Sequence, residues 1–196
     1  MATLSRVIAL SLLAAASSAC RQGQGPSEFR DGTTFTPAAM QHSGGHAESP
    51  LPAGIVTRNL RLLRQATVKF QALKQAGPSG YAIFGGCFAD STKGGMGQHY
   101  ANDALIADPA IKLTQPELLL YETTAEGREQ LVAVEYIVFV EDWHAAGNTQ
   151  PPRLFETDFH INPKLLPRPF YLLHVWVWKS NPAGLLSDWN PTVQCR

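Results

Sequence analysis

The chain has 196 residues, and its 16 Lys and Arg residues balance its 16 Asp and Glu residues, so the formal net charge at pH 7 is zero. A neutral chain without a basic stretch interleaved with aromatic residues does not favour nucleic acid as a partner. No phosphate loop of the GxxxxGK[ST] kind and no GxSxG nucleophile elbow is present, which argues against P-loop nucleotide binding and serine hydrolysis.

Residues 1–19 have the order of a secretory signal peptide: Arg6, then an apolar run, then small residues. The apolar run is shorter than the about 20 residues that cross a bilayer. Cleavage before Cys20 would leave a cysteine at the mature N-terminus, as in bacterial lipoproteins, although Ser17 stands where a lipobox usually has Leu or Val. We expect export to the bacterial cell envelope and a membrane anchor through lipidation of Cys20, with plain secretion as the alternative.

Residues 20–53 are rich in Gly, Pro, Ser and Gln and show no periodicity, which predicts a flexible tether. The remaining residues, 54–196, have the size of a single folded domain.

The chain contains three cysteines, and an odd number in an exported protein suggests that one of them has a separate role. If Cys20 carries lipid, Cys87 and Cys195 remain and can form a disulfide in an oxidising compartment. Two buried free thiols are the alternative.

Residues 54–76 show apolar side chains at spacings of three and four, which predicts an amphipathic helix that ends before Gly77 and Pro78. The polar side of this helix is basic and either faces anionic lipid headgroups or is simply solvated. Its basic residues are Arg58, Arg61, Arg64 and Lys69.

Beyond the helix, apolar runs separated by turn residues predict strands. We expect strands at 81–84, 117–123, 130–140 and 170–178, a hairpin turn at 124–127, a glycine-rich loop at 85–97 and an irregular crossing at 151–169. One helix followed by several strands predicts an α+β fold, in which the N-terminal amphipathic helix packs on a mainly antiparallel sheet or a partly closed barrel.

Two of these strands are apolar on both faces, yet each contains one titratable residue: Glu135 in 130–140 and His174 in 170–178. A buried polar group without a partner costs roughly 1 to 3 kcal/mol. If the two strands are neighbours, Glu135 and His174 can face each other.

His99 ends the glycine-rich segment and His160 lies in the irregular crossing, so both could close over the same end of the sheet. Three imidazoles and one carboxylate suit a single transition metal ion such as Zn, Cu, Fe or Mn. Tyr100 could orient a bound water or substrate. In the alternative interpretation, Glu135 is neutral or in a salt bridge, His174 is a satisfied core histidine, and the other two histidines lie on the surface.

The segments GGMGQHYAN and LHVWVWKSNPAGLLSDWNPTVQC resemble an uncharacterised family of bacterial exported proteins that share MGxHY and LHxWxWxxNPxGxxxxWNPxxxC motifs. The resemblance covers essentially all of 54–196 and implies a signal or lipobox, a tether and one domain. It also implies that the four candidate ligands, Tyr100, Cys87 and Cys195 belong to the signature of that family, for which it implies no established activity.

We therefore expect an exported, lipid-anchored protein with a mononuclear His/Glu metal site, which acts as a metal-dependent enzyme on a small molecule or handles the metal itself. The alternative is a non-catalytic envelope module that binds its partner through an aromatic surface. Four indoles could form that surface: Trp143, Trp176, Trp178 and Trp189.

Overall fold

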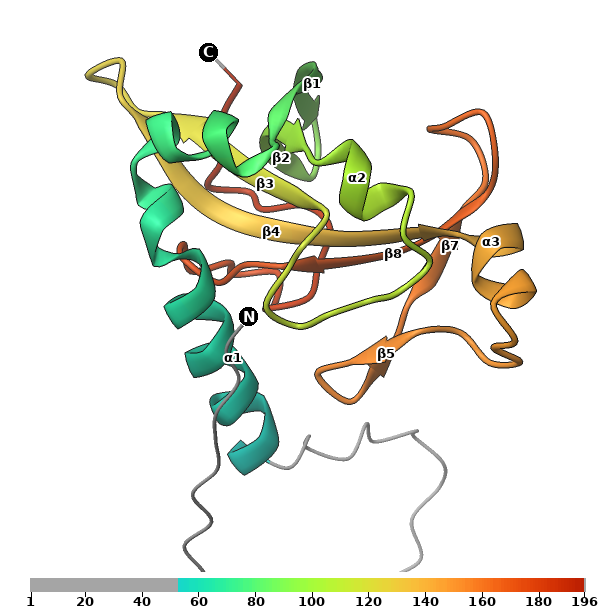
Figure 1. Ribbon diagram of the computed structural model, residues 1–196. Helices are drawn as coiled ribbons and strands as arrows, with labels where there is room; N and C mark the ends of the chain where they lie inside the picture. Colours follow the sequence, from blue (N-terminus) through green and yellow to red (C-terminus); the bar gives the residue numbers. More distant parts are fainter. Residues whose placement is uncertain (1–52, 196) are drawn as a thin grey trace, which may run out of the picture. The chain divides into compact units, whose positions relative to one another are not determined.

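The computed structural model describes residues 53–195; the expected signal peptide, the tether and Cys20 lie outside this range. Helix α1 packs on a curled antiparallel sheet (Figure 1), so the predicted α+β fold is confirmed. The six strands have the order β1-β2-β3-β4-β8-β7 and all neighbours are antiparallel. They are β1 (Ala82–Asp90), β2 (Gly94–Ala101), β3 (Leu118–Thr123), β4 (Glu129–Phe139), β7 (His160–Asn162) and β8 (Phe170–Val175).

Shorter elements lie between and beside these strands. The other helices are α2 (Asp103–Ile106) and α3 (Val140–Ala145), and a small hairpin is formed by β5 (Arg153–Leu154) and β6 (Thr157–Asp158). The hairpin between β3 and β4 is as predicted, and the crossing 151–169, expected to be irregular, supplies the hairpin and the edge strand β7.

The N-terminal helix is shorter than the sequence predicts. Helix α1 (Ala53–Thr67) is followed by three short 3₁₀ turns, η1 (Val68–Gln71), η2 (Leu73–Gln75) and η3 (Gly77–Ser79). At its end, the Thr67 hydroxyl donates to the carbonyl of Leu63 (2.7 Å) and accepts from Nε1 of Trp178 (3.1 Å). The prediction of one helix to residue 76 is wrong because these side-chain bonds to the helix and to a distant segment compete with its continuation.

The glycine-rich segment is a hairpin and not the predicted loop, because β1 and β2 pair from Ala82 to Ala101. Its glycines permit a close approach of the C-terminal segment: at Gly94, with φ +99°, a Cβ would lie 2.2 Å from the carbonyl oxygen of Asn190. Cys87 of β1 is joined to Cys195 by a disulfide, with 5.5 Å between the Cα atoms. The predicted disulfide is confirmed, and it indicates an oxidising environment such as an exported chain meets.

The central strands β3, β4 and β8 are buried on both faces, which explains why they are apolar on both sides. On one face, which we call the helix-covered face, side chains such as Tyr136 and Leu173 pack with Leu63 of α1. On the other, which we call the pocket face, Leu118, Ile137 and Phe170 belong to a second cluster. Because side chains alternate along a strand, each central strand contributes to both clusters.

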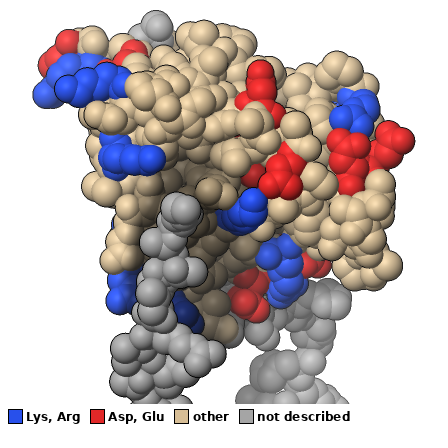
Figure 2. All heavy atoms as spheres, in the orientation of Figure 1, with Lys and Arg blue, Asp and Glu red and all other residues tan. Residues whose placement is uncertain are grey.

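Residues 53–195 contain no helix with the length and apolarity needed to cross a bilayer. Figure 2 shows basic and acidic side chains in small groups of both signs on the face in view. One of the arginines on the basic side of the helix is held by the fold, since Nε of Arg64 donates to the carbonyl of Val177 at 3.1 Å.

Candidate functional site

The two titratable residues of the doubly apolar strands lie directly opposite each other. Strands β4 and β8 are neighbours, and their register pairs Glu135 with His174 on the pocket face. Both side chains are buried, with 4% and 0% of the residue exposed. The sequence therefore predicted this pairing correctly.

His99 joins the pair from β2, although it was expected in a loop. Its Nε2 lies 3.4 Å from Oε2 of Glu135, across the intervening strand β3, and its ring packs edge-on against Phe88. Its Nδ1 lies 3.1 Å from the carbonyl oxygen of Gly97. A carbonyl can only accept, so Nδ1 carries the hydrogen and Nε2 of the neutral ring presents a lone pair to Glu135.

The residue that orients His99 must be glycine. Gly97 has φ +103°, and a Cβ at this position would lie 2.6 Å from the carbonyl oxygen of Tyr121. Only glycine adopts this conformation without strain and permits the approach of β3. The MGQH segment thus contains both the candidate ligand, His99, and Gly97, whose backbone carbonyl determines the tautomer of the His99 ring.

Burial shifts the pKa of both members of the contact toward the neutral forms. It raises the pKa of Glu135 to about 8, with a smaller contribution from the charge of Asp188. It lowers the pKa of His99 to about 4, against the opposing effect of the hydrogen bond that Nδ1 donates to the Gly97 carbonyl. The 3.4 Å contact has the distance of a salt bridge, but at pH 7 these pKa values describe a neutral acid beside a neutral imidazole, and we favour the neutral pair because both groups are desolvated.

His174 is the most unusual group of the site. It is fully buried, and neither ring nitrogen has a hydrogen-bond partner among residues 53–195. Its ring stacks on Trp176 at 4.9 Å, and burial, with the nearby charge of His99, lowers its pKa to about 3. A neutral imidazole with an unused lone pair and an unused N–H in the interior requires an explanation, such as an ion or a small molecule that binds there.

His160 does not join the other three candidates. It lies on the edge strand β7, its side chain is 49% exposed, and its Nε2 contacts Oδ2 of Asp188 at 3.2 Å. The hydrogen bond that the ring donates to Asp188 raises the pKa of this histidine. Within the described residues, no group of three or more His, Cys, Asp or Glu side chains lies close enough to hold a metal ion, so the expected four-ligand shell is not assembled.

Tyr100 is also separated from the site. As the neighbour of His99 in β2, it projects from the opposite side of the strand, and its ring packs edge-on against Tyr121 at 5.2 Å on the helix-covered face. It contacts neither His99 nor Glu135, so the expected role in orienting a ligand there is not supported.

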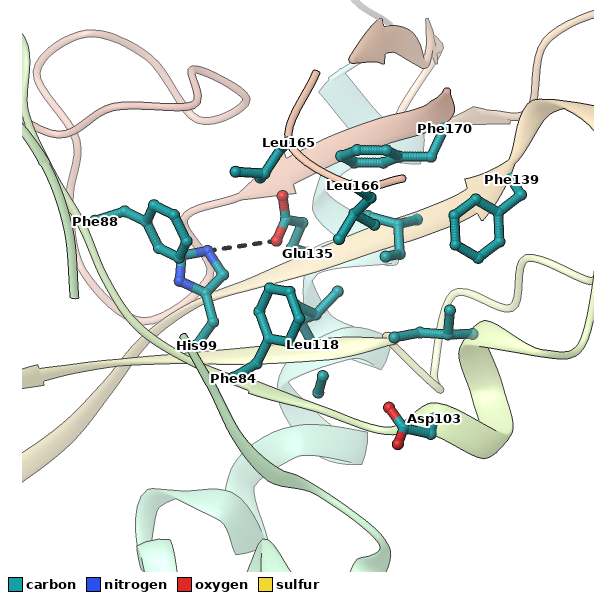
Figure 3. Close-up of a pocket in the computed structure, with 13 residues that line it drawn as sticks. Phe84, Phe88, His99, Asp103, Leu118, Glu135, Phe139, Leu165, Leu166 and Phe170 are labelled. Carbon is teal, nitrogen blue, oxygen red and sulfur yellow. Dashed lines mark ion pairs between the residues drawn. The ribbon is translucent and has the colours of Figure 1, made fainter. Parts of the chain in front are cut away.

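A cavity of about 200 Å³ opens beside His99 and Glu135 (Figure 3). Apart from these two residues and Asp103, its lining is apolar and comes from five separate regions of the chain. The apolar residues are Phe84, Phe88, Ala101, Ile106, Leu118, Ile137, Phe139, Leu165, Leu166 and Phe170. This cavity was not predicted from the sequence. The alternation of apolar side chains along the strands indicates which residues share a face of the sheet, but it does not show which segments of the chain meet there.

The tryptophans do not form an exposed aromatic surface. Trp176 is buried and the other three are partly buried. Three indoles donate hydrogen bonds within the fold: Trp143 to the carbonyl of Gln150, Trp176 to that of Ser187 and Trp178 to the hydroxyl of Thr67. Because three of the four indoles are partly and not fully buried, the alternative of a binding module with an aromatic surface stays a prediction.

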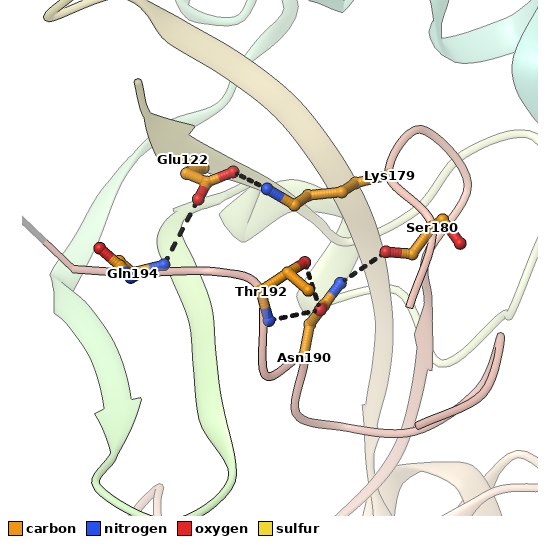
Figure 4. A network of polar contacts seen from close by, with 6 residues as sticks. All are labelled: Glu122, Lys179, Ser180, Asn190, Thr192 and Gln194. Carbon is orange, nitrogen blue, oxygen red and sulfur yellow. Dashed lines mark hydrogen bonds and ion pairs between the residues drawn. The ribbon is translucent and has the colours of Figure 1, made fainter. Parts of the chain in front are cut away.

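The conspicuous WNP motif near the C-terminus has a structural role. Asn190 is fully buried; its side chain donates to the carbonyl of Ser180 and accepts from Thr192, and its backbone pairs with Gly95 of β2 (Figure 4). Lys179 and Glu122 form an ion pair beside it. These contacts hold the C-terminal segment against the sheet.

No protein-family profile, curated protein or solved structure matches the chain. The resemblance based on the MGxHY and WNP motifs therefore stays a prediction, and the argument for function rests on the geometry of the site.

Proposed function

We propose that the chain is an exported, lipid-anchored protein that binds one transition metal ion through His99, Glu135 and His174 and acts on a small molecule held in the adjacent cavity. The observation that carries this proposal is His174, a fully buried imidazole with no partner for either nitrogen, directly opposite the His99–Glu135 contact.

The separation of His99 and Glu135 fits two ligands of one ion. Ligands at about 2.1 Å from a tetrahedral ion lie about 3.4 Å apart, and Nε2 of His99 is 3.4 Å from Oε2 of Glu135. With the ring hydrogen on Nδ1, two acceptor atoms face each other whenever Glu135 is ionised, so a proton or a cation has to lie between them. The carbonyl of Gly97 acts as the outer acceptor that metal-binding histidines usually have.

His174 would supply the third donor after its side chain moves, because the three side chains do not lie close enough to hold an ion as they stand. Residues directly opposite each other in an antiparallel pair have Cβ atoms about 4.5–5.5 Å apart, so rotation of the His174 ring can bring a nitrogen toward the Glu135 carboxylate. Two imidazoles and one carboxylate are a ligand set of catalytic zinc sites and leave one coordination position open. A bound ion of this type supplies Lewis acidity and lowers the pKa of a bound water.

The surrounding side chains determine what can reach that position. The edge-on ring of Phe88 covers His99, and the apolar lining of the cavity keeps bulk water from the carboxylate. Such a dry site strengthens electrostatic interactions with a bound substrate. The oxidising environment indicated by the disulfide supports export, and lipidation of Cys20 would keep the domain at the membrane surface.

Metal content tests the proposal. Untagged protein, stripped with a chelator and incubated separately with Zn²⁺, Cu²⁺, Fe²⁺ and Mn²⁺, should retain one ion per chain of at least one metal in elemental analysis. His174→Ala should lose that ion. The matched control is His144→Ala, because His144 is exposed and its ring contacts Asn148 and Tyr171 away from the site.

Wild-type protein that binds none of the four metals, or a His174→Ala variant that binds as much as wild type, would overturn the proposal. The hydrogen between His99 and Glu135 would then belong to a protonated Glu135 carboxyl, with no metal ion between the two side chains.

A further inference from the structure

We infer that the cavity beside His99 and Glu135 binds a compound with a single aromatic ring and one hydroxyl group, that is, a simple phenol. The inference rests on the proposed function in one respect, because it places the polar group of the ligand at the same His99–Glu135 pair.

The size of the cavity limits the ligand to one ring. An apolar cavity of roughly 150 Å³ accommodates benzene, and this cavity measures about 200 Å³. The difference leaves room for a hydroxyl or methyl substituent, whereas a second fused ring would require the walls to move, and close-packed interiors resist such movement.

The walls favour an aromatic ring. Four phenylalanines line the cavity, and Phe88 already makes an edge-on contact with the ring of His99 at 4.9 Å. Edge-on and offset ring pairs contribute about 0.5–1.5 kcal/mol beyond simple area burial. The other phenylalanines are Phe84, Phe139 and Phe170.

The polar groups favour a neutral hydroxyl over an anion. In the metal-free protein the carboxyl hydrogen lies between Oε2 of Glu135 and Nε2 of His99, and the other carboxyl oxygen of Glu135 is an acceptor that a ligand hydroxyl can satisfy. The lining contains two carboxyl groups, Glu135 and the exposed Asp103, and no Lys or Arg. A carboxylate ligand would therefore lose its hydration and find no cation in the lining, which disfavours it.

The lining contains both exposed and buried residues. Leu165 and Leu166 lie on the same side of the cavity as Phe170 (Figure 3), and Leu165 is 48% exposed. Asp103 is exposed as well, whereas His99 and Glu135 are buried. A ligand that enters from an exposed part of the lining therefore meets the pair at the buried part of the cavity.

The test is a titration of metal-free wild-type protein with p-cresol, toluene and benzoate, followed by calorimetry and by NMR contacts between ligand and protein. We expect saturable binding of p-cresol with contacts to Phe170 and Leu118, at least tenfold weaker binding of toluene, which lacks the hydroxyl, and weaker binding still of benzoate. Equal binding of p-cresol and benzoate, or contacts elsewhere on the protein, would overturn the inference.

Two variants separate this inference from the metal proposal. Ala101→Phe fills the cavity and should abolish p-cresol binding while the ion is retained, and its control is Ala89→Phe, at an exposed position of β1. His174→Ala should lose the ion and keep p-cresol, since His174 is not part of the cavity lining. If p-cresol still binds to folded Ala101→Phe with unchanged affinity, the cavity inference fails, whatever the metal content of the variant. If neither the wild type nor any variant binds metal while p-cresol binds as expected, only the metal proposal fails. Retention of the ion by Ala101→Phe shows that this variant is folded. If the variant lacks the ion, the NMR contacts between p-cresol and the wild-type protein decide whether p-cresol binds in the cavity.

Discussion

Nε2 of His99 lies 3.4 Å from Oε2 of Glu135, although strand β3 separates the two strands that carry them. The contact crosses β3 diagonally, because Glu135 pairs with Leu118 on one side of this strand and His99 pairs with Leu120 on the other. It is possible because the sheet curls, which brings side chains from non-adjacent strands together on its pocket face (Figure 1). The site thus depends on the curvature of the sheet as well as on the residues themselves.

The substitution Gly97→Ala tests the backbone that positions His99. A Cβ at Gly97 would clash with the Tyr121 carbonyl, and its φ of +103° is strained for alanine. We expect a loss of about 1–3 kcal/mol in the free energy of unfolding, measured by urea denaturation, together with weaker metal binding. The control is Gly86→Ala in the same hairpin, where a Cβ meets nothing within 4 Å and φ is not positive. Equal losses in the two variants would contradict this account.

A second buried carboxyl predicts a pH-dependent stability. Glu117 is 1% exposed, accepts a hydrogen bond from the amide of Ile137 at 3.3 Å, and burial raises its pKa to about 8. Between its ordinary pKa and about 8, the unfolded chain ionises this group while the folded chain keeps it protonated. Folding then takes up a proton, so the contribution of Glu117 to stability falls as the pH rises through this window.

Glu117→Gln removes this dependence while it keeps an acceptor oxygen for Ile137. Relative to wild type, the variant should gain on the order of 2–4 kcal/mol between pH 5 and pH 8, which chemical denaturation at several pH values measures. Glu141→Gln, at a largely exposed side chain, should follow the wild-type curve. A constant difference between Glu117→Gln and wild type across the pH range would show that Glu117 ionises normally in the folded state.

The disulfide between Cys87 and Cys195 should contribute strongly to stability, because it closes a loop with a sequence separation of 108 residues. Its reduction should lower the free energy of unfolding by about 2–5 kcal/mol and loosen the C-terminal segment that Asn190 attaches to β2. Denaturation with and without a reductant measures the loss. The double variant Cys87→Ala, Cys195→Ala should be destabilised to a similar extent and should not respond to the reductant; a response would point to some other effect of the reagent.

His160→Ala distinguishes a site of three ligands from the site of four that the sequence suggested. Because His160 is half-exposed and paired with Asp188, we expect the variant to retain the metal and to lose about 1 kcal/mol or less. The raised pKa of His160 means that this small contribution is present at low pH and is lost as the pH rises through the folded-state pKa. Elemental analysis and denaturation at pH 5.5 and pH 8 measure both effects, and a loss of the ion would place His160 among the ligands.

Local patterns in the sequence were sufficient to predict the fold class, the long apolar strands, the hairpin between them and the pair of Glu135 and His174. These features depend on periodicity and on the cost of burying an unpaired polar group, and both can be evaluated along the chain. The residues of the disulfide were also predictable, since counting cysteines leaves few alternatives.

The tertiary structure decided the rest. Gly94, Gly95 and Gly97 carry no side chains that reveal a strand, so only the backbones of β3 and the C-terminal segment show that β2 forms there and directs His99 inward. His160 was expected at the site but meets Asp188, because the segment after β8 folds back beside the edge strand. The cavity likewise exists only where β1, β2, α2, β3, β4 and the start of β8 with the segment before it converge. Sequence patterns report which residues seek burial, whereas the curl and register of the sheet determine which of them meet.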